Sequence, residues 1–75
     1  NMKQYHFSIV IEKDKDGYFA FCPELQGCYA EGDTYEEAIG NIKDAIKLHV
    51  EDRISDNEIL PQTESVSLST VEVAV

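Results

Sequence analysis

The sequence predicts an α+β domain with the element order β-β-β-α-β, in which one helix covers one face of a mixed four-stranded sheet. Alternating apolar and polar residues indicate strands near both ends of the chain. Between them, apolar residues recur at helical spacing from about Tyr35 to Ile54. Seventy-five residues suffice for a single domain, expected over 2–75, with a core small enough to favour an oligomer or a stable partner.

The first two predicted strands differ in how their apolar residues are arranged. Residues 5–12 alternate, so Phe7, Ile9 and Ile11 are expected on one face of a half-buried strand. A charged turn over residues 13–17 closes a hairpin with a second strand, Tyr18 to Cys22. This second strand is apolar on both faces, which predicts that something also covers the face opposite the helix. We therefore expect a homo-oligomer, at least a dimer.

The segment between the hairpin and the helix consists of turns and a cap. Cys22-Pro23 ends the second strand, because proline has no N–H to donate to a ladder. A short edge strand is expected over residues 28–31. Thr34-x-x-Glu37 fits a capping box, in which the threonine hydroxyl accepts from the third helical N–H and the glutamate reaches back.

The helix should bury one stripe and then stop before the last strand. Ser55-Asp56-Asn57 ends it, and Pro61 prevents its return. The stripe is expected to contain Ala38, Ile39, Ile42, Ala45, Ile46, His49, Val50 and Ile54.

The last strand, residues 65–75, changes the phase of its apolar residues. Val66 and Leu68 share one parity, whereas Val71, Val73 and Val75 share the other. Because a slip of one residue turns side chains to the opposite face, two interpretations remain. Either a bulge lies near residues 69–70, or the end of the strand leaves its own sheet and pairs elsewhere.

Composition limits the classes of function and location. A net charge of −9 argues against direct binding of nucleic acid and favours a basic protein partner, or simply a solvated surface. Two cysteines suit a reducing cytoplasm better than a disulfide scaffold. The apolar runs are far too short to span a membrane. Asn1 precedes Met2 and is expected to be a tag remnant, with Met2 as the natural start.

No arrangement of residues indicates catalysis, a cofactor or a metal site. The middle of the first strand lacks the carboxylates that a metal-dependent nuclease requires. Cys22 and Cys28 lack a second pair for zinc and are expected to be small buried residues. His49 lies on the apolar stripe, where packing is the usual role. The sequence therefore predicts a binding protein and not an enzyme.

The stretch FCPELQGCYAEGDTYEEA, residues 21–38, resembles the signature of the HicB-like antitoxin family. The similarity continues through the helix to Ile59-Leu60-Pro61 and the last strand. The resemblance implies a truncated ribonuclease-H-like fold with strand order 3-2-1-4. It also implies an antitoxin that covers the active site of a small, basic, RNA-cleaving toxin of the HicA type. Many members of the family carry a C-terminal DNA-binding segment, which we do not expect here because nothing basic follows the last strand.

The alternative is a stand-alone oligomeric domain with a regulatory or ligand-binding role and no toxin. A neighbouring reading frame for a small basic protein with a conspicuous histidine would separate the two. For a basic partner, the stretch from Glu24 to Glu37 is the predicted surface, because it contains five acids and no base. Its candidate contact residues are Glu24, Tyr29, Glu31, Tyr35, Glu36 and Glu37.

Overall fold

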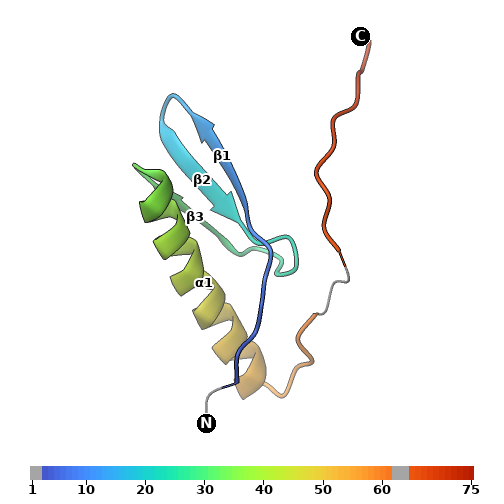
Figure 1. The fold of residues 1–75 in the computed structure, drawn as a ribbon. Helices are drawn as coiled ribbons and strands as arrows, with labels where there is room; N and C mark the ends of the chain where they lie inside the picture. The colour runs from blue at the N-terminus through green and yellow to red at the C-terminus, as the bar shows by residue number, and fades with distance from the viewer. Residues whose placement is uncertain (1–2, 62–64) are drawn as a thin grey trace.

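The computed structural model describes residues 3–61 and 65–75, so the predicted tag remnant Asn1 and the start at Met2 lie outside the described residues. Its elements are β1 (Val10–Asp14), β2 (Gly17–Phe21), β3 (Tyr29–Gly32) and α1 (Tyr35–Ser55). The strands form an antiparallel sheet in the order β1-β2-β3, and α1 runs along one face of it (Figure 1). The predicted α+β class and the order of these four elements are confirmed. No helix in the described part of the chain combines the length and the apolar content that crossing a membrane requires.

The hairpin between β1 and β2 has a tight, locally stabilised turn. Asp14 pairs with Gly17 across Lys15-Asp16, and the Asp14 carboxylate accepts a hydrogen bond of 2.8 Å from the Asp16 N–H. Gly17 has a φ of 130°, a conformation that other residues rarely adopt.

The predicted start of the first strand at Tyr5 is wrong, because β1 begins at Val10. Residues 5–9 have no partner strand: β2 has ended by Cys22, and β1 is itself the edge of the sheet. Phe7 and Ile9 nevertheless pack against the core. The segment is thus partly buried, as a strand would be, although it does not pair with a neighbouring strand among the described residues.

A compact loop over residues 22–28 joins β2 to β3. The Cys22 N–H donates to the Cys28 carbonyl at 3.0 Å, and the Leu25 N–H donates back to the Cys22 carbonyl at 3.2 Å. Leu25 fills the centre of the loop and is among the largest fully buried side chains. Cys22 and Cys28 are buried free cysteines, as predicted. The third strand starts at Tyr29, one residue later than expected.

The predicted threonine cap at the start of α1 is confirmed, and the glutamate reaches back as predicted but to the residue before the N-cap. The Thr34 hydroxyl accepts from the Glu37 N–H at 3.1 Å, and the Glu37 carboxylate accepts from the Asp33 N–H at 2.9 Å. This cap lies directly beside Gly32, where an added Cβ would lie 2.5 Å from the Ala38 nitrogen. The chain can turn from β3 into α1 this tightly only because residue 32 has no side chain.

The buried stripe of α1 is shorter than predicted. Ala38, Ile42 and Val50 are buried and Ile46 is partly buried, but Ile54 is exposed. A helix of 21 residues is about 31 Å long, whereas strands of four or five residues span about 17 Å at most. The last turns of α1 therefore extend beyond the sheet.

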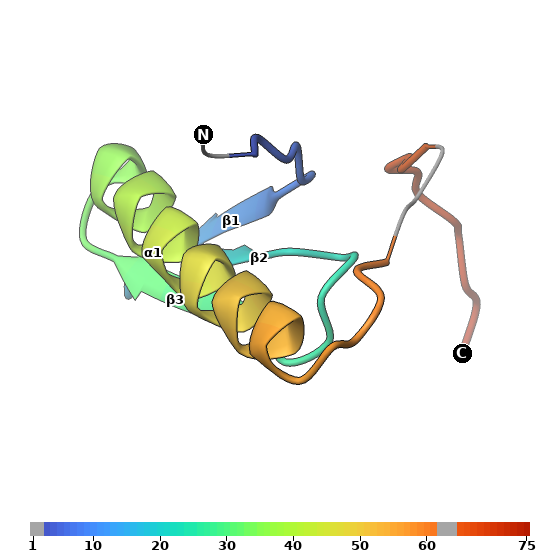
Figure 2. The same ribbon diagram turned by 90° about the horizontal axis from the view of Figure 1, so that it is seen from below.

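The predicted fourth strand does not join the sheet. Residues 65–75 are extended, yet they stand apart from the strands in two perpendicular views (Figures 1 and 2). Within the described residues the sheet has three antiparallel strands and not the predicted four mixed ones. A physical reason lies at Leu60-Pro61: Leu60 packs against the core, while a residue before proline is restricted to extended conformations that lead the chain away.

We predict that Ile42→Ala lowers the free energy of unfolding by about 2–5 kcal/mol, because it leaves a cavity where the side chain is 1% exposed. Leu48→Ala is the matched control on the same helix, since Leu48 is 68% exposed. Urea titrations followed by circular dichroism measure both. Equal losses would show that the buried face of α1 is misassigned.

Glycine positions 32 and 40 should respond in opposite directions to the same substitution. Gly32→Ala should destabilise the fold, because its Cβ would overlap the backbone of Ala38. Gly40→Ala meets open space in the middle of α1 and should raise stability by up to about 1 kcal/mol through helix propensity. Thermal melts of the two variants check this, and a stabilising Gly32→Ala would contradict the packing described at the helix start.

Candidate partner-binding surface

The face of the sheet opposite α1 has no covering element within the described residues. Cross-strand partners lie on the same face, so the register assigns two rows of side chains to it. One row is Glu12, Phe19 and Glu31; the other is Val10, Phe21 and Tyr29. We call these six residues the aromatic face.

The rings of the aromatic face lie close together. Phe19 stacks on Tyr29 with their centroids 5.8 Å apart, and Phe19 and Phe21 are 6.3 Å apart. Tyr29 is 62% exposed, while Phe19 is half-buried between two exposed carboxylates, Glu12 and Glu31. The surface therefore offers a ring cluster with negative charge on two sides.

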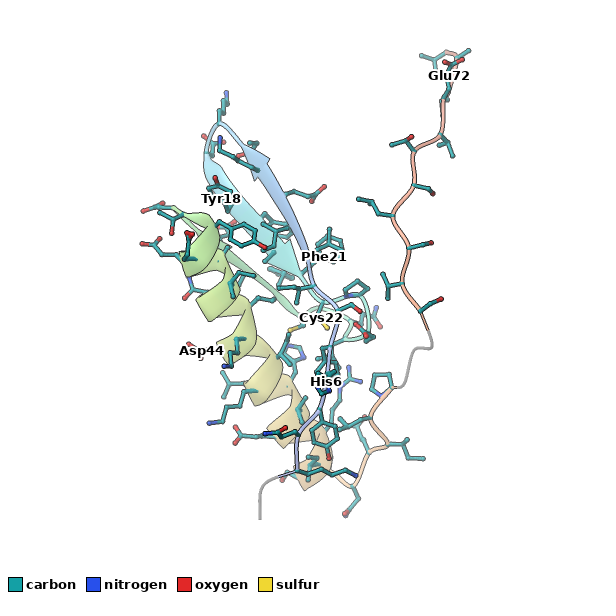
Figure 3. The ribbon with its side chains drawn as sticks, in the orientation of Figure 1. His6, Tyr18, Phe21, Cys22, Asp44 and Glu72 are labelled. Carbon is teal, nitrogen blue, oxygen red and sulfur yellow. The ribbon has the colours of Figure 1, made fainter. Side chains whose placement is uncertain are left out.

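The double-sided apolar pattern of β2 is now explained. Ala20 and Cys22 face α1 and are buried in the core, whereas Phe19 and Phe21 point to the opposite face. Tyr18, at the hairpin end of β2, lies on the helix side, at the other end of the strand from Phe21 (Figure 3). The sequence pattern indicated this second apolar face, but only the strand register shows that Val10 and Glu12 belong to it.

An open groove of about 740 Å³ runs from the aromatic face to the helix start. It passes over the β1–β2 hairpin and the turn before α1, so it brings predicted residues Glu31 and Glu37 to one concave surface. Its acidic lining comprises Glu12, Asp14, Asp16, Glu31, Asp33 and Glu37.

The six predicted contact residues do not form one patch. Tyr29 and Glu31 belong to the aromatic face. Tyr35 lies on the other side of the sheet, where its ring meets that of Tyr18 edge to face at 6.3 Å. Glu36 is exposed in the first turn of α1, and Glu37 also holds the cap.

Glu24 has a different environment from the other predicted acids. It is half-buried, and its carboxylate accepts hydrogen bonds from the Ser8 N–H at 3.1 Å and the Cys22 thiol at 3.6 Å. Burial, reinforced by this nearby carboxylate, raises the pKa of the Cys22 thiol, and burial also raises the pKa of Cys28. These residues connect the loop to the segment before β1.

The contact groups of the aromatic face are aromatic rings and carboxylates. Across residues 3–61 and 65–75, no group of three or more His, Cys, Asp or Glu side chains is arranged to hold a metal ion. Neither cysteine is exposed. Fold and surface together define a small α+β domain with an uncovered aromatic and acidic face.

Comparison with known proteins identifies the family. Residues 7–73 match the HicB-like antitoxin of bacterial toxin–antitoxin systems, and the chain therefore belongs to this family. A UPF0150 protein of Synechocystis is 44% identical over 63 residues, which cover 83% of this chain and 80% of the relative. A UPF0150 protein of Helicobacter pylori is 45% identical over 65 residues, which cover 87% and 90%.

A solved structure agrees with this assignment. A chain of a HicA3 and HicB3 toxin–antitoxin complex superimposes with a TM-score of 0.64 at 25% identity, covering 80% of this chain and 70% of that one. The resemblance seen in residues 21–38 is thus confirmed, and an antitoxin role is supported by both the family and the fold.

Proposed function

We propose that this protein neutralises a HicA-type, RNA-cleaving toxin by binding over its active site, with the aromatic face as the main contact surface. The observation that carries the proposal is the cluster of half-buried Phe19 and Phe21 with exposed Tyr29, which lies beside Glu12 and Glu31. Membership of an antitoxin family and similarity to a chain from a toxin–antitoxin complex support it.

The chemistry of the two surfaces is complementary. A protein that cleaves RNA presents Lys and Arg to phosphate. Arg and Lys bind well over aromatic rings and pair with carboxylates, and the aromatic face supplies both within one patch. Tyrosine is also favoured at the centre of interfaces, where it buries a large area and retains a polar end.

Charge would also speed the encounter. The net charge of −9 attracts a cationic partner over a distance, and the acidic groove extends that attraction from the aromatic face towards the helix start. Neutralisation in this scheme is occlusion of the toxin in the cytoplasm. In this scheme the antitoxin itself performs no reaction.

Tyr29→Ala should weaken binding to the cognate toxin about tenfold or more, because it removes the most exposed ring of the cluster. Tyr35→Ala is the control: it removes an exposed tyrosine on the helix side of the sheet. Binding is measured by calorimetry with the toxin encoded beside this gene, and neutralisation by residual cleavage of a labelled RNA. The antitoxin alone should leave that RNA intact.

The opposite result, a loss with Tyr35→Ala and none with Tyr29→Ala, would move the contact surface to the helix start. If the protein neither binds nor inhibits that toxin, the stand-alone regulatory domain becomes the better interpretation.

The carboxylates beside Phe19 should act mainly on the association rate. Glu12→Gln with Glu31→Gln should slow association several-fold at low salt and much less at high salt, because exposed charges are screened. Glu51→Gln with Glu58→Gln makes the same change in charge at other exposed positions and controls for net charge. The association rates of both variant pairs are measured by stopped flow at two ionic strengths. Equal slowing by both pairs would mean that overall charge alone guides the encounter.

A further inference from the structure

The open edge over residues 7–11, which ends in the first two residues of β1, lacks the features that usually protect an exposed sheet edge. β1 is the first strand in the order β1-β2-β3, so one of its sides has no neighbour among the described residues. Exposed edges are usually blunted by charged residues, proline or a bulge. Residues 7–11 are Phe-Ser-Ile-Val-Ile, and charged residues begin only at Glu12 near the hairpin.

The backbone of this edge is oriented for pairing. The Ser8 N–H donates to Glu24, in the loop that follows β2, so Ser8 presents its backbone towards the β2 side. Successive residues of an extended chain present their backbone groups to opposite sides. Phe7, Ile9 and Ile11 therefore direct their N–H and C=O groups to the open edge.

An apolar groove of about 260 Å³ lies beside this edge. It separates residues 5–9 from the middle of α1, and it is lined by Tyr5, Phe7, Ile9, Ile39, Ile42, Lys43 and Ile46. Six of these seven residues are apolar or aromatic. A strand laid along the edge could fill this groove with its own apolar side chains.

Segment 65–75 has the properties of the missing strand. It is extended and lies apart from the sheet (Figures 1 and 2), and in the view of Figure 1 it runs upwards as β1 does. Leu68 is 87% exposed and Val71 is 85% exposed, as is unusual for such residues in a folded protein. Glu72, its one charged residue, projects near the far end (Figure 3).

We propose that segment 65–75 of one copy pairs with the open edge of β1 in a second copy, and that the second copy returns the same contact. Each sheet then has four strands in the order 3-2-1-4, with the fourth strand supplied by the partner. A bulge at Ser69-Thr70 would place both sets of valines and leucine on the face that meets the groove. This inference concerns the edge of the sheet and the groove on its helix side, not the rings of the aromatic face, although Val10 and Glu12 adjoin both.

A second copy is favoured over the chain's own sheet for two reasons. First, Leu60 is held against the core and, as the residue before Pro61, is restricted to extended conformations that lead the chain away from its own sheet. Reciprocal exchange also brings the segment and the edge, residues 65–75 and 5–13, into one two-fold interface. The number of residues that each copy contributes to this interface matches the roughly 20–30 residues a side of a stable interface.

Electrostatics permits this contact despite the net charge of −9 on each copy. Segment 65–75 contributes only Glu72, and residues 7–11 contribute no charge. Where the edge continues towards the hairpin, the acid Glu12 is followed by the base Lys13. The exchanged elements are therefore the parts of the chain where self-repulsion is smallest.

The first test uses the full chain in light scattering after size exclusion, from about 1 to 100 µM. The expected mass is twice the chain mass of 8.5 kDa.

Val71→Lys with Val73→Lys should weaken the dimer at least tenfold, because both side chains share the face that would be buried. Glu72→Lys is the matched control: it changes the net charge by the same amount in the same segment but from the opposite side, and it should leave the dimer intact. Helical circular dichroism should be unchanged in all variants, since the segment is exposed in each chain.

The second test identifies the occupant of the edge. A mixed sample of isotope-labelled and unlabelled chains should give intermolecular contacts in NMR between residues 66–73 and residues 7–11. Contacts only within a chain would show that the segment closes on its own sheet. A monomer at every concentration, a dimer unaffected by Val71→Lys with Val73→Lys, or a segment that contacts the edge only after the toxin is added would each overturn the proposal.

Discussion

The close approach of backbone to backbone at Gly32 is the constraint on which the rest of this structure depends. The chain leaves β3, turns through Asp33 and Thr34, and begins α1 within two residues. That turn fixes the helix against β3 and β2. The Thr34 hydroxyl and the Glu37 carboxylate accept hydrogen bonds from the N–H groups of Glu37 and Asp33, which the turn would otherwise leave unpaired. Ala38 and Ile42 are buried because the helix starts there and nowhere else.

Because α1, the one helix among the described residues, lies on one side of the sheet, the other side remains exposed. The core contains small or medium side chains, with Ala20, Cys22 and Cys28 on the helix side. The large rings of Phe19, Phe21 and Tyr29 are on the opposite side. Three of the chain's large rings thus lie outside its core, as is expected of a protein that completes its burial with a partner.

The sequence was informative wherever a local rule applied. The capping box, the hairpin, the proline at the end of β2 and most of the helical stripe follow from short-range chemistry, and each is found within about two residues. Ile54 and the segment before Val10 were assigned wrongly because their state depends on how far the sheet reaches. The candidate site was only partly predicted, since joining Tyr29 to Phe19 and Glu12 requires the register of three strands. The phase change after Leu68 indicated that the last strand was irregular, but only the arrangement in space shows that it lies apart from its own sheet.

The short-range contacts among β1, β2, β3 and α1 have a consequence for biosynthesis. Each of these elements contacts its neighbour in the sequence, and proteins rich in such short-range contacts fold quickly. On the ribosome, the three strands and the helix precede segment 65–75, so the body of the domain can assemble before that segment is made. A nascent chain would then offer its open β1 edge while its own last strand is still unfinished. If two copies exchange this segment as proposed, neighbouring ribosomes on one message would place a completed segment within reach of such an edge and give the pairing a kinetic route during translation.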